Sequence, residues 1–123
     1  MTRRLLIVDD EPEILAEMAE YFEAKGYRVE QAADGLEALE RIEAGAPDAL
    51  ITDLKMPRCD GFDLIKRLRE ANNHVPIVAV AGTFSHADLA RAGALGAQVV
   101  MRKPIGLREL AEKLRALLEP AGT

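Results

Sequence analysis

Short apolar segments alternate along this chain with longer segments in which apolar residues recur every three or four positions. The short runs predict buried strands, and the three-to-four spacing predicts amphipathic helices. The strands are expected at residues 4–8, 27–32, 49–53, 77–81 and 98–102. Strands that alternate with helices are typical of a parallel sheet with crossover helices. The pattern therefore predicts one α/β domain.

Helices are expected between successive strands and after the last one. The first begins near Pro12, which suits the first turn of a helix, and ends at Gly26. The fourth is the alanine-rich segment 85–94. The apolar stripes of the other four are Ile14, Leu15, Met18 and Phe22; Leu36, Leu39 and Ile42; Phe62, Ile65 and Leu68; and Leu107, Leu110, Leu114 and Leu117.

Five strand–helix units of this length favour a doubly wound fold, a five-stranded parallel sheet in the order 2-1-3-4-5 with five helices on its two faces. Right-handed crossovers place the first and third strands side by side at the centre of such a sheet. Ligands bind outside the carboxyl ends of those strands. The residues that follow them are therefore the first candidates for a functional site.

Three of the apolar runs lead into charged side chains. The first is followed by Asp9 and Asp10, the third ends at Asp53, and the fifth leads to Lys103. Because parallel strands end at the same edge of a sheet, three carboxylates and one ammonium are expected to converge there. Such a cluster is costly unless a cation or a transferred anion completes it.

The acidic turn after the first strand limits what this cluster can bind. Its sequence, Asp9-Asp10-Glu11-Pro12, repels phosphate and lacks one backbone donor, unlike a phosphate-binding turn. Mg²⁺ fits better, since it prefers carboxylate oxygens and waters. With the ion bound, Asp53 can stay ionised and accept a phosphoryl group as a nucleophile. Lys103 would share in neutralising the phosphoryl oxygens.

Composition narrows the range of partners. The chain has 123 residues, enough for one domain, and its net charge of −5 argues against a nucleic-acid partner. No apolar stretch approaches the roughly 20 residues that span a bilayer, so no membrane partner is expected. Cys59 is the single cysteine, which excludes an intrachain disulfide and a paired-cysteine metal site. A cytoplasmic protein is expected.

Together these motifs resemble the receiver domains of response regulators in two-component signalling, including the single-domain chemotaxis type. The similarity extends over essentially the whole chain, with 1–119 as the receiver domain and 120–123 as a tail or the start of a linker. The matching residues are Leu-Ile-Val-Asp9-Asp10-Glu11-Pro12, Asp53-Leu-Lys-Met-Pro57 with Asp60-Gly61, and Lys103-Pro104.

The resemblance implies a role for each residue of the cluster. Asp53 would accept phosphate from the phosphohistidine of a sensor histidine kinase or phosphotransfer protein. Asp10 and Asp53 would ligate Mg²⁺ directly, Asp9 would hold a metal-bound water, and the Lys55 backbone carbonyl would be the third protein ligand. Lys103 would contact the phosphoryl group, and its peptide bond to proline would be cis. The domain would then be a phosphoacceptor, and not an enzyme with a substrate of its own.

Two positions depart from the family pattern. Receivers usually carry Thr or Ser at the end of the fourth strand, where this chain has Ala81. They usually carry Tyr or Phe three positions before the lysine, where this chain has Val100. Thr83 is the nearest hydroxyl that would replace the missing one. The hypothesis is an atypical switch, in which phosphorylation occurs but its propagation is altered.

Other interpretations stay open at this point. The main alternative is a pseudo-receiver, an interaction module that no longer switches by phosphorylation. A flavoprotein fits the fold, but the acidic turn argues against it. A metal-dependent phosphohydrolase also fits the fold, but it would need an acid where this chain has Lys55. The downstream partner would be a separate protein or an output domain beyond residue 123. Arg58 and the side chain of Lys55 are expected to be solvated loop charges.

Overall fold

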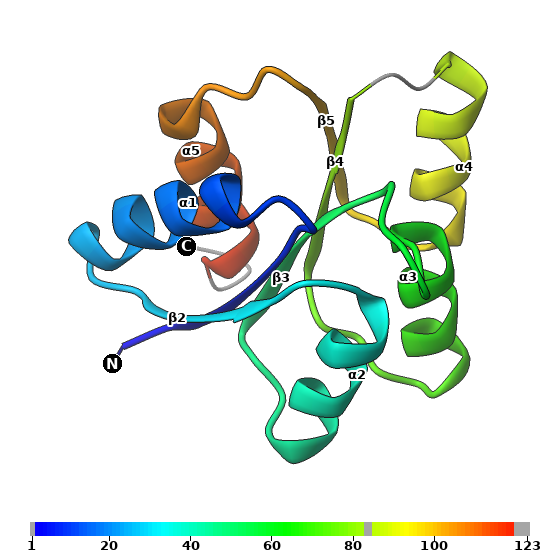
Figure 1. The fold of residues 1–123 in the computed structure, drawn as a ribbon, viewed down its shortest axis with the longest axis horizontal. Coiled ribbons are helices and arrows are strands. Elements are labelled where there is room, and N and C mark those ends of the chain that lie inside the picture. The colour runs from blue at the N-terminus through cyan, green and yellow to red at the C-terminus, as the bar shows by residue number, and fades with distance from the viewer. Residues whose placement is uncertain (1, 83–84, 120–123) are drawn as a thin grey trace.

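The computed structural model describes residues 2–82 and 85–119, and its centre is a five-stranded parallel sheet (Figure 1). The strands lie in the order β2-β1-β3-β4-β5, which confirms the predicted topology. They are β1 (Arg4–Val8), β2 (Arg28–Ala32), β3 (Ala49–Asp53), β4 (Ile77–Ala81) and β5 (Val99–Arg102).

Two strands begin one residue later than predicted, β2 at Arg28 and β5 at Val99. The N–H of Tyr27 bonds to the carbonyl of Phe22 in the turn that closes the first helix. The N–H of Gln98 bonds to the carbonyl of Ile77, and the Gln98 side chain accepts a hydrogen bond from the Ile77 N–H.

Helices follow the strands as predicted. They are α1 (Pro12–Ala24), α2 (Gly35–Ala44), α3 (Gly61–Glu70), α4 (His86–Leu95) and α5 (Leu107–Leu118). Asp34, Asp60 and Ser85 cap the starts of α2, α3 and α4, each accepting a backbone N–H three residues on. No helix in the described ranges is long and apolar enough to cross a membrane.

The helices form two layers, α1 and α5 on one face of the sheet and α2, α3 and α4 on the other (Figure 1). Each layer encloses its own hydrophobic cluster. The first contains Phe22 from α1 and Leu110 and Leu114 from α5, all fully buried. The second contains α2 and α3 residues and the small side chains of β4. Of the residues described in α4, Ala92 alone is fully buried.

Two glycines let the β3–α3 loop lie close to its neighbours. A Cβ atom on Gly61 would stand 2.4 Å from the Asp53 carbonyl oxygen. A Cβ atom on Gly35 would stand 2.4 Å from the carbonyl oxygen of Cys59. Real Cβ atoms do not tolerate such distances, so both positions require glycine. The loop after Asp53 is therefore packed against the starts of α2 and α3.

Candidate functional site

The carboxyl ends of β1 and β3 bring three acidic side chains together. One carboxylate oxygen from each of Asp9, Asp10 and Asp53 lies within 4.8 Å of the others. Asp9 and Asp53 are 3% and 6% exposed, whereas Asp10 is open to solvent. Strands β1 and β3 are paired side by side, which explains why residues 43 or more positions apart in sequence meet here.

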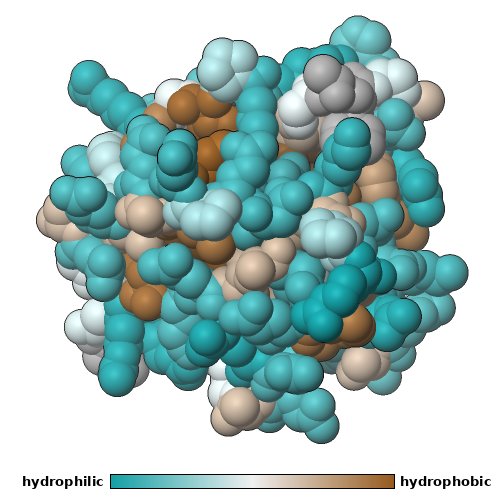
Figure 2. Space-filling model, viewed as in Figure 1, coloured by the Kyte–Doolittle hydropathy of each residue, from teal (hydrophilic) through white to brown (hydrophobic). Residues whose placement is uncertain are grey.

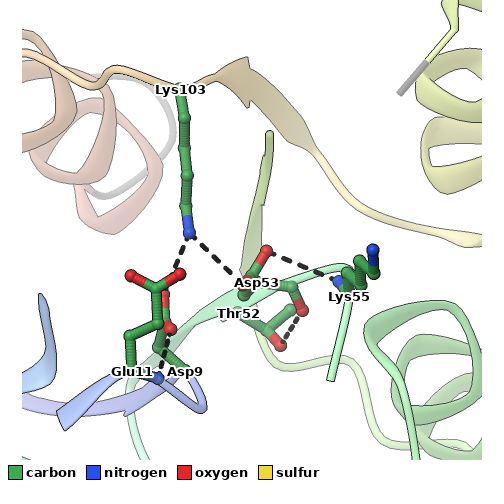
Figure 3. Close-up of polar contacts among 6 residues, drawn as sticks. All are labelled: Asp9, Glu11, Thr52, Asp53, Lys55 and Lys103. Carbon is green, nitrogen blue, oxygen red and sulfur yellow. Dashed lines mark hydrogen bonds and ion pairs between the residues drawn. The ribbon is translucent and has the colours of Figure 1, made fainter. Parts of the chain in front are cut away.

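Lys103 joins this cluster from the loop after β5. Its ammonium nitrogen lies 3.3 Å from Asp9 Oδ2 and 3.3 Å from Asp53 Oδ2 (Figure 3). The backbone N–H of Lys103 bonds to the carbonyl of Ala81, which anchors the loop to the end of β4. The peptide bond between Lys103 and Pro104 is cis, as the resemblance implied.

Backbone hydrogen bonds hold the two buried carboxylates in place. The N–H of Glu11 donates to Asp9 Oδ1 at 2.9 Å, and the N–H of Lys55 lies 3.4 Å from Asp53 Oδ1 (Figure 3). The Thr52 hydroxyl donates to the carbonyl of Asp53 at 2.9 Å. Each buried acid thus presents one oxygen to Lys103 while the other faces a backbone donor.

The electrostatics of the cluster are unbalanced. Burial raises the pKa of the Asp53 carboxyl group; Lys103 works against this shift and Asp9 adds to it. Burial alone would lower the pKa of Lys103, but attraction from Asp53 and Asp9 prevails and raises it. A single ammonium therefore does not fully compensate the carboxylates, and a further positive charge would stabilise the ionised form of Asp53.

Open space lies next to the acidic cluster. A cavity of about 550 Å³ reaches Asp53 and Lys103 from the solvent. Its lining residues are Asp10, Glu11, Asp53, Lys55, Met56, Pro57, Gly82 and Lys103. Since three carboxylates are a donor set that suits a hard divalent ion, the residues present fit Mg²⁺.

A second cavity, of about 540 Å³, borders Asp53 from the side of α1 and α5. Its walls are mostly apolar and include Ile14, Met18 and Ile105. Figure 2 shows apolar surface in this area, at the upper left, where α1 and α5 lie in Figure 1. The phosphoacceptor candidate thus lies between an acidic opening and an apolar one. The sequence patterns did not reveal the second opening, because the same side chains also form core stripes.

Comparison with known proteins agrees with this geometry. The family model described as the response regulator receiver domain matches residues 5–115. The chain belongs to the response regulator receiver domain family. Among curated relatives, the response regulator MprA of Mycobacterium ulcerans is 37% identical over 118 residues, which cover 96% of this chain and 51% of the relative. The receiver therefore spans about half the length of the curated relatives it matches.

Solved structures give the same result. A Vibrio cholerae chemotaxis protein, CheY4, is 30% identical with a TM-score of 0.88, over 96% of this chain and all of that one. The Francisella response regulator 1452 receiver domain is 28% identical with a TM-score of 0.91, over 95% and 97% of the two chains. Both the receiver assignment and the likeness to chemotaxis-type regulators are thereby confirmed.

The positions that depart from the receiver pattern lie together in the structure. Ala81 is fully buried at the end of β4, and Val100 is half-buried on β5. Both pack into the hydrophobic cluster that faces α4. Thr83 lies outside the described residues. The structure thus places an alanine methyl group and a small branched side chain on the α4 side of the sheet.

Arg58 is exposed, as expected, but it also forms a contact that the sequence did not indicate. Its guanidinium forms an ion pair with Asp34 at the start of α2, at 2.7 Å. Together with the Glu37 N–H, which has the larger effect, this contact lowers the pKa of Asp34 despite its burial. Arg58 and Asp34 are 24 positions apart, and no sequence motif joins them. The exposed side chain of Lys55 lies at the edge of the acidic cavity, as expected.

Proposed function

We propose that this receiver accepts a phosphoryl group on Asp53 in a Mg²⁺-dependent step. The observation that supports this most strongly is the position of the Asp53 carboxylate, 3.3 Å from the Lys103 ammonium and beside the oxygens of Asp9 and Asp10. A nucleophile and an ammonium group thus lie side by side at an opening to solvent. No separate substrate pocket is needed for this role, and the domain acts as a phosphoacceptor.

The proposed metal ligands come from the acidic cluster and the loop behind it. Asp10 and Asp53 would hold Mg²⁺ directly, Asp9 would hold it through a water, and the Lys55 backbone carbonyl would complete the protein ligands. When bound, the ion supplies positive charge to the phosphoryl oxygens. The residues fit this role because Asp9 and Asp53 are buried acids that share one ammonium.

The bonds that form and break in the transfer belong to this chain and the donor. The Asp53 carboxylate oxygen attacks phosphorus, a phosphorus–oxygen bond forms, and the phosphorus–nitrogen bond of the donor phosphohistidine breaks. The bonding electrons stay with the imidazole nitrogen. Lys103 stabilises the charge on the phosphoryl oxygens as the group moves. Its raised pKa keeps it protonated for this task.

A protein is the proposed donor, namely a sensor histidine kinase or a histidine phosphotransfer protein. The apolar cavity beside Asp53, lined by Ile14, Met18 and Ile105, offers such a protein a hydrophobic contact next to the acceptor. The signal would then pass to a downstream protein or to an output domain. We place the domain in the cytoplasm, where a free thiol such as that of Cys59 stays reduced.

The proposal is tested by withdrawing the metal. Acetyl phosphate, a small phosphodonor, is expected to add one phosphoryl group to the protein in the presence of Mg²⁺ and none in excess chelator, as read by intact mass. Without the ion the uncompensated carboxylates repel the incoming anion. No mass gain with Mg²⁺ present would instead favour the pseudo-receiver, an interaction module that keeps only the fold.

We further propose that the switch of this receiver is atypical. Ala81 has no hydroxyl to donate toward a phosphoryl group at Asp53, and Val100 has no aromatic ring to rotate into the core. Both side chains pack in the cluster next to α4. Phosphorylation should therefore change the structure near α4 and β5 less than a hydroxyl and an aromatic ring would allow.

The switch is tested by restoring the hydroxyl. Amide NMR spectra of the free and beryllofluoride-bound protein are expected to differ near Asp53 but little across residues 85–115. Ala81→Thr should enlarge the changes across that range, while Ala81→Val, with the same shape but no hydroxyl, should not. Large shifts over residues 85–115 in the wild type would contradict a muted switch.

A further inference from the structure

We propose that Arg58 is a positioning residue for the magnesium site, acting through its ion pair with Asp34. The inference rests on the proposed function, because it concerns the loop whose Lys55 carbonyl would ligate the ion. Arg58 lies in that loop, three residues beyond Lys55, and its partner lies at the start of α2. The pair would hold the loop in the conformation that the metal requires.

The ion pair has the geometry of a fixed contact. Arg58 Nε lies 2.8 Å and Arg58 Nη2 lies 2.7 Å from the same oxygen, Asp34 Oδ2. The other oxygen of Asp34 accepts the N–H of Glu37 at 2.9 Å. The Asp34 side chain is only 10% exposed, whereas that of Arg58 is 60% exposed. Asp34 is therefore the immobile partner, and the loop is fastened to it.

A backbone contact fastens the same part of the loop. The N–H of Gly35 donates to the carbonyl of Cys59 at 2.9 Å, and the missing Cβ of Gly35 permits this approach. At its other end the loop is held by the N–H of Leu54, which bonds to the carbonyl of Val80 on β4. Lys55 lies between these two anchors. Loss of the Arg58–Asp34 ion pair would loosen the loop at its Cys59 end. The Lys55 carbonyl could then move away from the carboxylates.

The backbone conformation of Arg58 is unfavourable for arginine, which indicates that the ion pair of its side chain compensates. Its φ angle is +65°, in the left-handed region that side chains with a Cβ atom disfavour. Glycine and asparagine adopt this conformation more readily. Arginine gains the ion pair in return. Arg58→Asn therefore removes the contact while keeping a residue that tolerates the turn.

Charge and position predict opposite effects of this substitution. A positive charge near an acidic cluster repels Mg²⁺, so its removal alone would tighten Mg²⁺ binding. Loss of the Arg58–Asp34 ion pair would weaken Mg²⁺ binding, because the Lys55 carbonyl must then be ordered when the ion binds. The sign of the change in the dissociation constant thus separates the two roles.

The experiment measures the Mg²⁺ dissociation constant of the full chain by calorimetry. Arg58→Asn and Asp34→Asn are expected to raise it about three- to tenfold, at the low end of effects of residues that support metal ligands. The dissociation constant of the double variant should rise no more than that of the more affected single variant. Arg58→Lys should restore part of the affinity for Mg²⁺. Arg28→Gln is the control. It removes an equal charge from an exposed residue at the amino end of β2, whereas the site lies at the carboxyl ends of the strands.

A kinetic measurement excludes a merely structural role. The Mg²⁺ concentration for half-maximal phosphorylation by acetyl phosphate should rise in Arg58→Asn, while the rate at saturating Mg²⁺ stays near that of the wild type. Melting curves without metal show whether each variant folds. Unchanged or tighter Mg²⁺ binding in Arg58→Asn would overturn the inference and leave the proposed function intact. Absence of Mg²⁺ binding in the wild type would overturn both.

Discussion

Replacing Asp53 by asparagine is expected to abolish phosphoryl uptake and to stabilise the metal-free protein at the same time. Uptake is lost because an amide is not a nucleophile, and Asp53 is the carboxylate that strand β3 holds 3.3 Å from Lys103 Nζ. Intact mass after incubation with acetyl phosphate and Mg²⁺ should show one added group in the wild type and none in the variant.

The gain in stability follows from the direction of the Asp53 pKa. Burial raises this pKa above the ordinary value of 3.8. A carboxyl group with a raised pKa favours folding below pH 3.8 and loses that contribution as the pH rises through its folded pKa. The wild type incurs this loss as the pH rises from acid toward neutral, and Asp53→Asn avoids it. The difference in unfolding free energy should therefore shrink in acid.

Magnesium should narrow or reverse this difference. A ligand that binds only the folded state stabilises it, and only the wild type keeps the Asp53 ligand. Denaturant unfolding at pH 7 and pH 4, with and without Mg²⁺, measures all four differences. Asp60→Asn is a matched control, since asparagine caps a helix as well as aspartate. A variant less stable than the wild type without metal at pH 7 would show that the ionised Asp53 carboxylate does not lower the free energy of unfolding.

Replacing Lys103 by glutamine is expected to slow phosphoryl uptake about 100- to 1,000-fold, the usual cost of losing one group that stabilises a transition-state charge. Glutamine keeps a donor on a side chain of similar length but removes the positive charge beside Asp53. The rate of mass gain at saturating Mg²⁺ measures the effect directly.

The same substitution should affect metal binding in the opposite direction. Lys103 and a divalent ion compete for the oxygens of Asp9 and Asp53, so Lys103→Gln should bind Mg²⁺ more tightly. Lys113→Gln, on an exposed part of α5, should change neither quantity. Slower uptake together with weaker Mg²⁺ binding would indicate that Lys103 organises the site as a whole, and not the phosphoryl charge alone.

Most of the fold could be predicted because each local signal agreed with the parallel topology. Runs such as 49–53 are fully buried, and helix stripes such as that of Phe22 and its neighbours meet the sheet. Among the strands, the errors were confined to the first residues of β2 and β5. There, Tyr27 bonds within the turn that closes α1, and Gln98 bonds to Ile77 of β4 through both its backbone and its side chain. Strand patterns do not distinguish such positions.

The convergence of the charged residues was also predictable, since strand order alone brings Asp9, Asp53 and Lys103 to one edge. The pairing of Arg58 with Asp34 was not. It depends on the path of the β3–α3 loop and on a left-handed residue within it. Hydrophobic periodicity and capping motifs predict helices and strands, but neither predicts the partner of an exposed arginine side chain.

Helix α4 differs from the other four in how little it contributes to the interior. Ala92 is the one fully buried residue among those described in it, and it belongs to the same hydrophobic cluster as the small side chains Ala79 and Ala81 of β4. Apolar burial is worth about 25 cal/mol per Å², so detaching this helix sacrifices less hydrophobic free energy than detaching α1 or α3. Partial unfolding should accordingly start at α4, which makes this edge of the sheet the one most readily reshaped by a binding partner.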